Sequence, residues 1–156
     1  MQKTIKFLGL ALLGMLLITT GCKKETENVE EDLGLKFTVT TSDGDSWTTS
    51  SVNAKTENGK FVITATKDDK QVVLTIKEFA KGKYTFTDTL NYATYNPVKS
   101  DASKLYTSAI SQDNYVEIQN IHSDNERFDG RFSFLATDKD MNVLTVSGSW
   151  INVAKQ

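Results

Sequence analysis

Hydrophobic and polar residues alternate with a period of two along most of the chain after residue 33. In residues 60–67, for example, Phe61, Ile63 and Ala65 fall on one face, and residues 70–77 repeat the pattern. Successive side chains of a strand point to opposite faces of a sheet, so this spacing predicts strands with one buried face. No segment after residue 32 keeps the 3.6-residue spacing of an amphipathic helix. We therefore expect an all-β domain.

Two turn signals connect the first strands. Asn58-Gly59 accepts the positive φ angles of a type I′ hairpin, and Asp68-Asp69 provides a second tight reversal. Together they predict three consecutive antiparallel strands between Trp47 and Lys77.

Further strands are expected at residues 35–41, 84–86, 105–110, 115–121, 128–136 and 143–153. The polar and aromatic residues 88–103, which include Pro97, are expected to form a loop. Gly130 lies inside a predicted strand, where a missing side chain permits a bulge or the close passage of a neighbouring strand. Gly148, in a similar place in the last strand, is expected to let the chain coil. About eight to nine antiparallel strands predict a sandwich or a flattened up-and-down barrel, and a lipocalin-like barrel is included in that prediction.

The amino terminus has the order of a secretory signal. Lys3 and Lys6 precede the apolar run 7–18, and three small residues stand before Cys22. The apolar run is too short for a membrane-spanning helix, which needs about 20 residues. We expect residues 1–21 to be removed, residues 22–32 to form an acidic tether and residues 33–156 to form one domain.

The sequence Thr-Thr-Gly-Cys at residues 19–22 resembles the lipobox of bacterial lipoproteins. That resemblance implies that Cys22, the only cysteine, carries acyl chains such as palmitate that bind the membrane. Residues 23–32 resemble the charged segments of surface-exported lipoproteins of Bacteroidota-type bacteria, and a plain spacer is the alternative. Because Lys23 follows the cysteine, the resemblance favours the outer membrane, with the domain displayed on the cell surface.

Charge and composition exclude several function classes. The net charge is −2, and Arg127 and Arg131 are the only arginines, so the clustered basic residues of a nucleic-acid-binding protein are absent from the sequence. His122 has no second histidine or nucleophile motif to work with. Asp138, Asp140 and Asn142 are spaced like calcium ligands but lack the rest of that loop, and a hairpin turn explains them better. We expect no enzyme activity, metal or cofactor.

Aromatic residues are the remaining candidates for binding. Trp47, Tyr92 and Tyr95 could form a platform for a glycan or a small apolar ligand, with core packing as the alternative reading. In addition, Asp88-Thr89-Leu90 resembles the acceptor pattern for O-linked glycans on exported Bacteroidota-type proteins, which marks Thr89 for modification.

The glycine and aromatic residues form a recognisable series along the domain. It consists of Trp47, Gly82-Lys83-Tyr84-Thr85-Phe86, Tyr92-Ala93-Thr94-Tyr95, residues 128–134 and residues 146–153. The series resembles small lipoproteins of unknown function from Bacteroidota-type bacteria, which implies an all-β domain behind a lipid anchor and no activity. We expect a non-enzymatic binding or scaffolding domain for a glycan, a small apolar ligand or an envelope protein. The alternative is a lipocalin-like carrier of a small apolar molecule.

Overall fold

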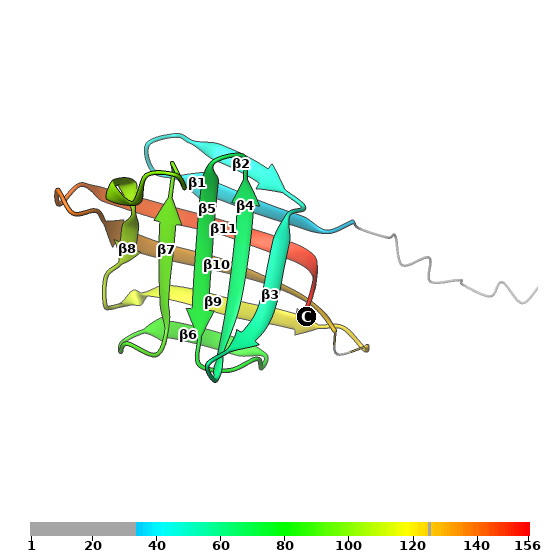
Figure 1. Ribbon diagram of the computed structural model, residues 1–156. Coiled ribbons are helices and arrows are strands. Elements are labelled where there is room, and N and C mark those ends of the chain that lie inside the picture. Colours follow the sequence, from blue (N-terminus) through cyan, green and yellow to red (C-terminus); the bar gives the residue numbers. More distant parts are fainter. Residues whose placement is uncertain (1–33, 125) are drawn as a thin grey trace, which may run out of the picture. The chain divides into compact units, whose positions relative to one another are not determined.

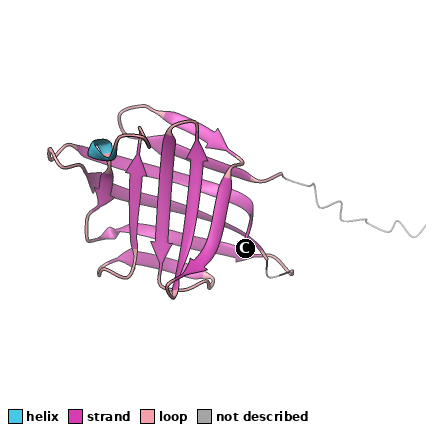
Figure 2. Ribbon diagram, in the orientation of Figure 1, coloured by secondary structure: helices cyan, strands magenta, loops and turns pink. Residues whose placement is uncertain are grey.

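The computed structural model describes residues 34–124 and 126–156, in which antiparallel strands form one continuous sheet (Figures 1 and 2). The strands are β1 (Lys36–Thr41), β2 (Ser46–Thr49), β3 (Val52–Glu57), β4 (Lys60–Lys67), β5 (Lys70–Ile76), β6 (Gly82–Phe86), β7 (Tyr92–Asn96), β8 (Tyr106–Ser108), β9 (Ser111–Ile121), β10 (Arg127–Thr137) and β11 (Val143–Ala154), with a short 3₁₀ helix, η1 (Ala102–Lys104), before β8. The all-β prediction is confirmed. None of the helices in this described part is long and apolar enough to cross a membrane.

The sheet folds over itself into a flattened, nearly closed barrel. One layer contains β3, β4, β5 and β7, and its strands cross steeply over those of the other layer, which contains β1, β11, β10, β9 and β6 (Figure 1). The three-residue strand β8 joins the layers, because it pairs with β7 on one side and with the end of β10 on the other. At the opposite seam, Thr49 Oγ1 of β2 donates to Thr66 O of β4 at 2.8 Å, and Gln156 N–H donates to Ala54 O of β3 at 2.7 Å.

Most predicted strands are present, and the hairpin turns are confirmed. Asn58 and Gly59 both have positive φ, as a type I′ turn requires, and Lys67 pairs with Lys70 across the second reversal. Two strands come in addition to the nine expected. The first strand of the predicted hairpin breaks at Ser50 into β2 and β3, and β7 runs through residues that were expected to be a loop, so that expectation is wrong for residues 92–96.

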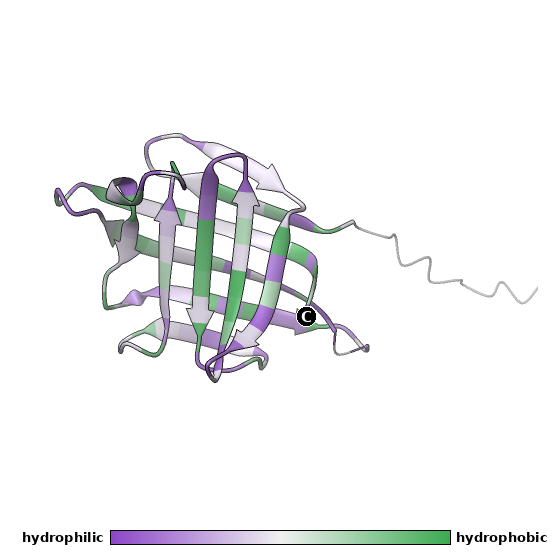
Figure 3. Cartoon of the chain, in the orientation of Figure 1, coloured by the Kyte–Doolittle hydropathy of each residue, from purple (hydrophilic) through white to green (hydrophobic). Residues whose placement is uncertain are grey.

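Aromatic side chains fill the interior between the layers. The Phe37 ring stacks on Phe132 and Trp150, with centroids 5.6 and 5.8 Å apart, and Phe61 meets Phe128 edge-on at 5.5 Å. All five are nearly or completely buried. Such pairs stabilise a core beyond the effect of their buried area alone. Figure 3 shows that hydrophobic residues lie mainly in the strands and that most turns are polar. The connection after β8 is an exception.

Both strand glycines allow close packing, which was predicted for Gly130. A Cβ atom on Gly130 would lie 2.2 Å from the Trp150 ring and 2.3 Å from Glu117 O, and the ladders of β10 change register beside it. A Cβ atom on Gly148 would lie 2.0 Å from Thr38 O. The prediction for Cys22 and the tether falls on residues outside the described part.

Candidate functional site

Of the three predicted aromatic residues, only Tyr92 presents its ring to solvent. Its side chain is 40% exposed, whereas Tyr95 and Trp47 are 2% and 7% exposed and belong to the core. Tyr92 and Tyr95 lie three positions apart on β7, so the alternation of the strand sends their side chains to opposite faces. The platform of three rings is therefore wrong, and core packing accounts for Tyr95 and Trp47.

Tyr95 has a structural role at one end of the barrel. Its hydroxyl donates to Asp45 Oδ2 at 3.1 Å, and the same carboxylate pairs with Lys70 Nζ at 2.6 Å. Burial, followed by the hydrogen bond to Asp45, raises the pKa of Tyr95 to about 12. The hydrogen bond from Lys70 lowers the pKa of Asp45 despite its partial burial. The three groups tie the β1–β2 turn to β5 and β7.

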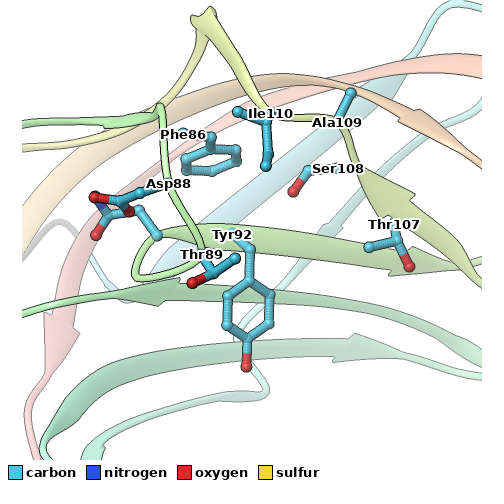
Figure 4. A pocket seen from close by; sticks show the side chains of 9 residues that line it. Phe86, Asp88, Thr89, Tyr92, Thr107, Ser108, Ala109 and Ile110 are labelled. Carbon is cyan, nitrogen blue, oxygen red and sulfur yellow. The ribbon is translucent and has the colours of Figure 1, made fainter.

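Tyr92 borders a pocket of about 330 Å³ on the outside of the barrel (Figure 4). The lining residues come from the β6–β7 connection, β7, β8 and the segment after β8: Phe86, Asp88, Thr89, Asn91, Tyr92, Thr107, Ser108, Ala109 and Ile110. This volume is at the lower end of the range of small-molecule sites in proteins.

The pocket forms where β7 and β8 separate. The two strands pair only at Thr94–Thr107 and Tyr95–Tyr106. One step further, the Ala93 N–H no longer reaches a backbone carbonyl of β8 and donates instead to Ser108 Oγ at 2.9 Å. A side chain thus replaces a ladder bond, and the strands open around it. Since Ser108 Oγ accepts this bond, its hydroxyl hydrogen can be donated to a ligand.

Carbon atoms form the floor of the pocket and polar groups form its rim. Phe86 is buried beneath it, and Ile110 stands at its edge with 67% of its side chain exposed. Figure 4 shows Thr89 beside Tyr92 and facing the segment Ser108–Ile110. Asp88 accepts a hydrogen bond from Leu90 N–H at 2.8 Å, which shapes the turn that carries Thr89.

Lys60 brings a positive charge to the rim from β4. Its Nζ lies 5.3 Å from the centroid of the Tyr92 ring and donates to Thr89 O at 3.2 Å. The ammonium group covers one face of the Tyr92 ring, and its hydrogen bond links the β6–β7 connection to β4. Asn91 is nearly buried and uses both ends of its amide, since Oδ1 accepts from Lys77 N–H and Nδ2 donates to Thr85 O.

The polar residues considered for catalysis or metal binding are occupied by structural contacts. His122 Nε2 donates to Asp129 Oδ1 at 3.1 Å, and Asn152 N–H donates to the same oxygen at 2.8 Å. Partial burial would raise the pKa of Asp129, but these two donors outweigh it and lower the pKa. Within the described ranges, no three histidine, cysteine or acidic residues are grouped as a metal site would require.

The loop of Asp138, Asp140 and Asn142 is a hairpin turn. Asp138 Oδ1 accepts from the N–H groups of Asp140 and Asn142, both at 2.9 Å, and the side chain of Asn142 donates to the other oxygen. The predicted hairpin turn is therefore present.

Sequence reasoning missed the residues on the β8 side of the pocket. Thr107, Ser108 and Ile110 carry no motif, and only the fold brings them to Tyr92, more than 14 positions away. One signal was available. Ile110 is a large apolar residue in an otherwise polar stretch from Ser108 to Asn114, and a solvated strand end does not require one.

One family model matches the chain, over residues 38–153, and it is described as a domain of unknown function (DUF6252). The match covers nearly the whole described domain. No curated protein and no solved structure shows significant similarity to the chain.

Proposed function

The chain belongs to this family of uncharacterised domains, and we propose that it is a lipid-anchored, non-enzymatic binding protein that receives its ligand in the pocket beside Tyr92. The observation that carries the proposal is the opening between β7 and β8. There, apolar carbons lie next to Ser108 and Asp88, which can exchange hydrogen bonds with a ligand. An apolar floor with a few fixed polar groups is the usual composition of a binding site.

The position of the pocket at the surface favours a binding protein over a carrier that holds its ligand inside the barrel. A lipocalin-like carrier needs a cavity within the barrel, and the stacked rings of Phe37, Phe132 and Trp150 occupy that interior. Catalysis has little support at the pocket, because Asp88 is its only titratable carboxylate or imidazole and already accepts a backbone hydrogen bond.

The lipid anchor and the cellular location in this proposal are argued from the sequence. Cys22 after an apolar run is the acylation site in this proposal, and Lys23 directs the protein to the outer membrane of a Bacteroidota-type cell, with the domain on the surface. A location on the cell surface is consistent with a pocket that opens directly to solvent.

Filling the pocket tests the function. The full-length protein in lipid nanodiscs is applied to an array of neutral glycans, is titrated with dodecanoate as an apolar ligand, and is incubated with solubilised envelope proteins of the native host. We expect one of these probes to bind, and Ala109→Phe to weaken binding at least tenfold by occupying the pocket. Ala102→Phe, on the exposed η1 helix, is the matched control. Binding that Ala109→Phe leaves unchanged, or no binding of either probe or of an envelope protein, would contradict the proposal.

We also propose that Thr89 carries an O-linked glycan. It is exposed in the turn between β6 and β7, where a modifying enzyme can reach it. The tryptic peptide Tyr84–Lys99 from the native host should then have added hexose mass, which Thr89→Ala removes. An unmodified peptide from native membranes would refute the assignment.

A further inference from the structure

Several large hydrophobic side chains of the barrel are exposed to solvent. Among the residues that the structure describes, those that are exposed lie between positions 90 and 143. Six of them surround the pocket and the corner at β8, and we call these six the apolar patch: Leu90, Tyr92, Ile110, Leu135, Met141 and Val143, with exposures between 40% and 77%.

The ladder registers show that the patch is continuous. Ile110 follows Ala109, whose N–H donates to Leu135 O at 3.0 Å. Thr107 of the pocket pairs with Thr137, which in turn pairs with Val143. Leu135 lies two positions from Thr137 and therefore projects from the same face of β10. The patch thus extends from the pocket across β8 and β10 to the first residue of β11.

A small ligand would not cover this surface. Met141 and Val143 are 77% and 59% exposed and do not line the pocket. Exposed apolar surface that extends beyond a pocket marks contact with a macromolecule or a membrane.

The charges beside the patch distinguish these two partners. The charged residues within three positions of a patch residue along the chain are four aspartates, Asp88, Asp113, Asp138 and Asp140, and one lysine, Lys139. A second lysine, Lys60 of β4, lies 5.3 Å from the Tyr92 ring, so the charge beside the patch is negative in sum. Lys139 pairs with Asp140 at 3.3 Å. An acidic border is repelled by anionic lipid headgroups and attracts lysine and arginine side chains.

The patch lies far from the point at which the chain enters the barrel. The chain enters the barrel at Lys36, which pairs with Ile151 near the end of β11. Val143 lies at the other end of this strand, about 27 Å away at roughly 3.4 Å per residue. In Figure 1 the start of β1 and the β8 corner are accordingly on opposite sides of the barrel.

From these observations we infer that the occupant of the site is a protein segment that places an apolar side chain in the pocket and basic side chains against the surrounding aspartates. This inference rests on the proposed binding function and specifies its ligand class. Each apolar side chain buried at the centre of such an interface adds to affinity, while the charges set orientation and association rate.

Site-specific photocrosslinking in native membranes tests the inference on the full-length protein. A benzoylphenylalanine replaces Ile110 or Val143, and replacement of the exposed Thr48 on β2 is the control. Both patch positions should crosslink to one protein, at a segment that carries apolar residues flanked by lysine or arginine. Crosslinks to phospholipid, to a second copy of the chain, to an acidic segment, or at the yield of the Thr48 control would overturn the inference.

A synthetic peptide of the crosslinked segment then separates the inference from the function proposed above. Val143→Ser and Val143→Asp, outside the pocket, should each weaken peptide binding at least fivefold, and 300 mM NaCl should weaken it relative to 50 mM. If Ala109→Phe abolishes binding and both Val143 variants bind normally, the pocket function stands and the protein partner is wrong. If Ala109→Phe also binds normally, both proposals fail.

Discussion

The side chain of Asn114 accepts the hydrogen bond that Leu135 N–H would otherwise donate to a neighbouring strand. Along β10, pairing with β9 ends at Ser133 and pairing with β8 begins at Ala136, so the backbone of Leu135 lies in the gap. Asn114 Oδ1 accepts from Leu135 N–H at 2.9 Å, and its Nδ2 donates to Ala109 O at 2.7 Å. The residue is 3% exposed, so water cannot easily replace these bonds.

Replacing Asn114 should therefore be costly. Asn114→Ala leaves buried backbone groups unpaired and should lower the free energy of unfolding by about 1–3 kcal/mol, measured by urea denaturation. Gln119→Ala, an exposed residue of the same strand, is the control and should change stability by less than about 0.5 kcal/mol. Equal effects of the two substitutions would show that the amide does not bridge the gap.

Gly130 gives a second prediction at the residue scale. A methyl group there would overlap the Trp150 ring and Glu117 O, and the carbonyl cannot move without breaking a ladder. Gly130→Ala should destabilise the fold by about 1–3 kcal/mol, as overpacked cores are, and lower the melting temperature. Gly34→Ala has open space around the added atom and serves as control. A melting temperature unchanged in Gly130→Ala would contradict the close approach.

The same two residues show what a sequence can reveal. The close packing at Gly130 is predictable, because a glycine within an alternating strand already indicates a missing side chain. Asn114 is not predictable, since nothing local distinguishes a buried asparagine that bridges two strands from one in a solvated turn. The pocket has the same difficulty, because Ser108 and Tyr92 meet only after the sheet closes.

At the scale of elements, β7 is the strand that the hydrophobic pattern concealed. Its five residues place Tyr92 and Thr94 on the outer face and Ala93 and Tyr95 on the inner face. Each face carries a tyrosine and a small residue, so the two faces differ little in hydrophobicity. The sequence therefore shows no alternation of apolar and polar residues here. In contrast, β4 and β5 have a plainly apolar face and were predicted almost to the residue.

The turn between β1 and β2 is held to the opposite layer by Asp45, and this contact depends on pH. Because the pKa of Asp45 in the folded protein is lowered from 3.8, its ionised form adds stability above about pH 4, and this contribution is lost as the pH falls through the folded pKa. The pair with Lys70 is about one-third exposed, so its contribution should be below about 1 kcal/mol.

Asp45→Asn should accordingly be less stable than the wild type at pH 6, and the difference should shrink as the pH is lowered to 2, measured by urea denaturation at both values. The amide can still accept the Tyr95 hydroxyl, so the variant removes mainly the charge. Asp113→Asn, at an exposed position of β9, is the control. A stability difference that persists undiminished at pH 2 would show that the carboxylate charge is not what stabilises the turn.

At the scale of the whole molecule, the barrel and the proposed lipid anchor have separate physical origins. The barrel is held by an aromatic core within residues 34–156 and by side chains that close its seams. The proposed attachment to a membrane would depend instead on acyl chains. Each buried methylene of such a chain contributes about 0.8 kcal/mol, so two or three chains bind persistently. Substitution of Cys22 should thus change where the protein is found without changing its fold.

Cys22→Ser tests this separation in the native host. The wild-type protein should begin at residue 22 with acyl mass on its first peptide, and should remain with membranes after extraction at high pH. The serine variant has no thiol to acylate, so its first peptide should lack acyl mass and more of the protein should be released. Its circular dichroism spectrum should stay that of a β protein, because residues 34–156 supply every strand described here. A wild-type amino terminus without acyl mass would remove the lipid anchor and leave the pocket and the apolar patch as features of a protein that reaches its partner by another route.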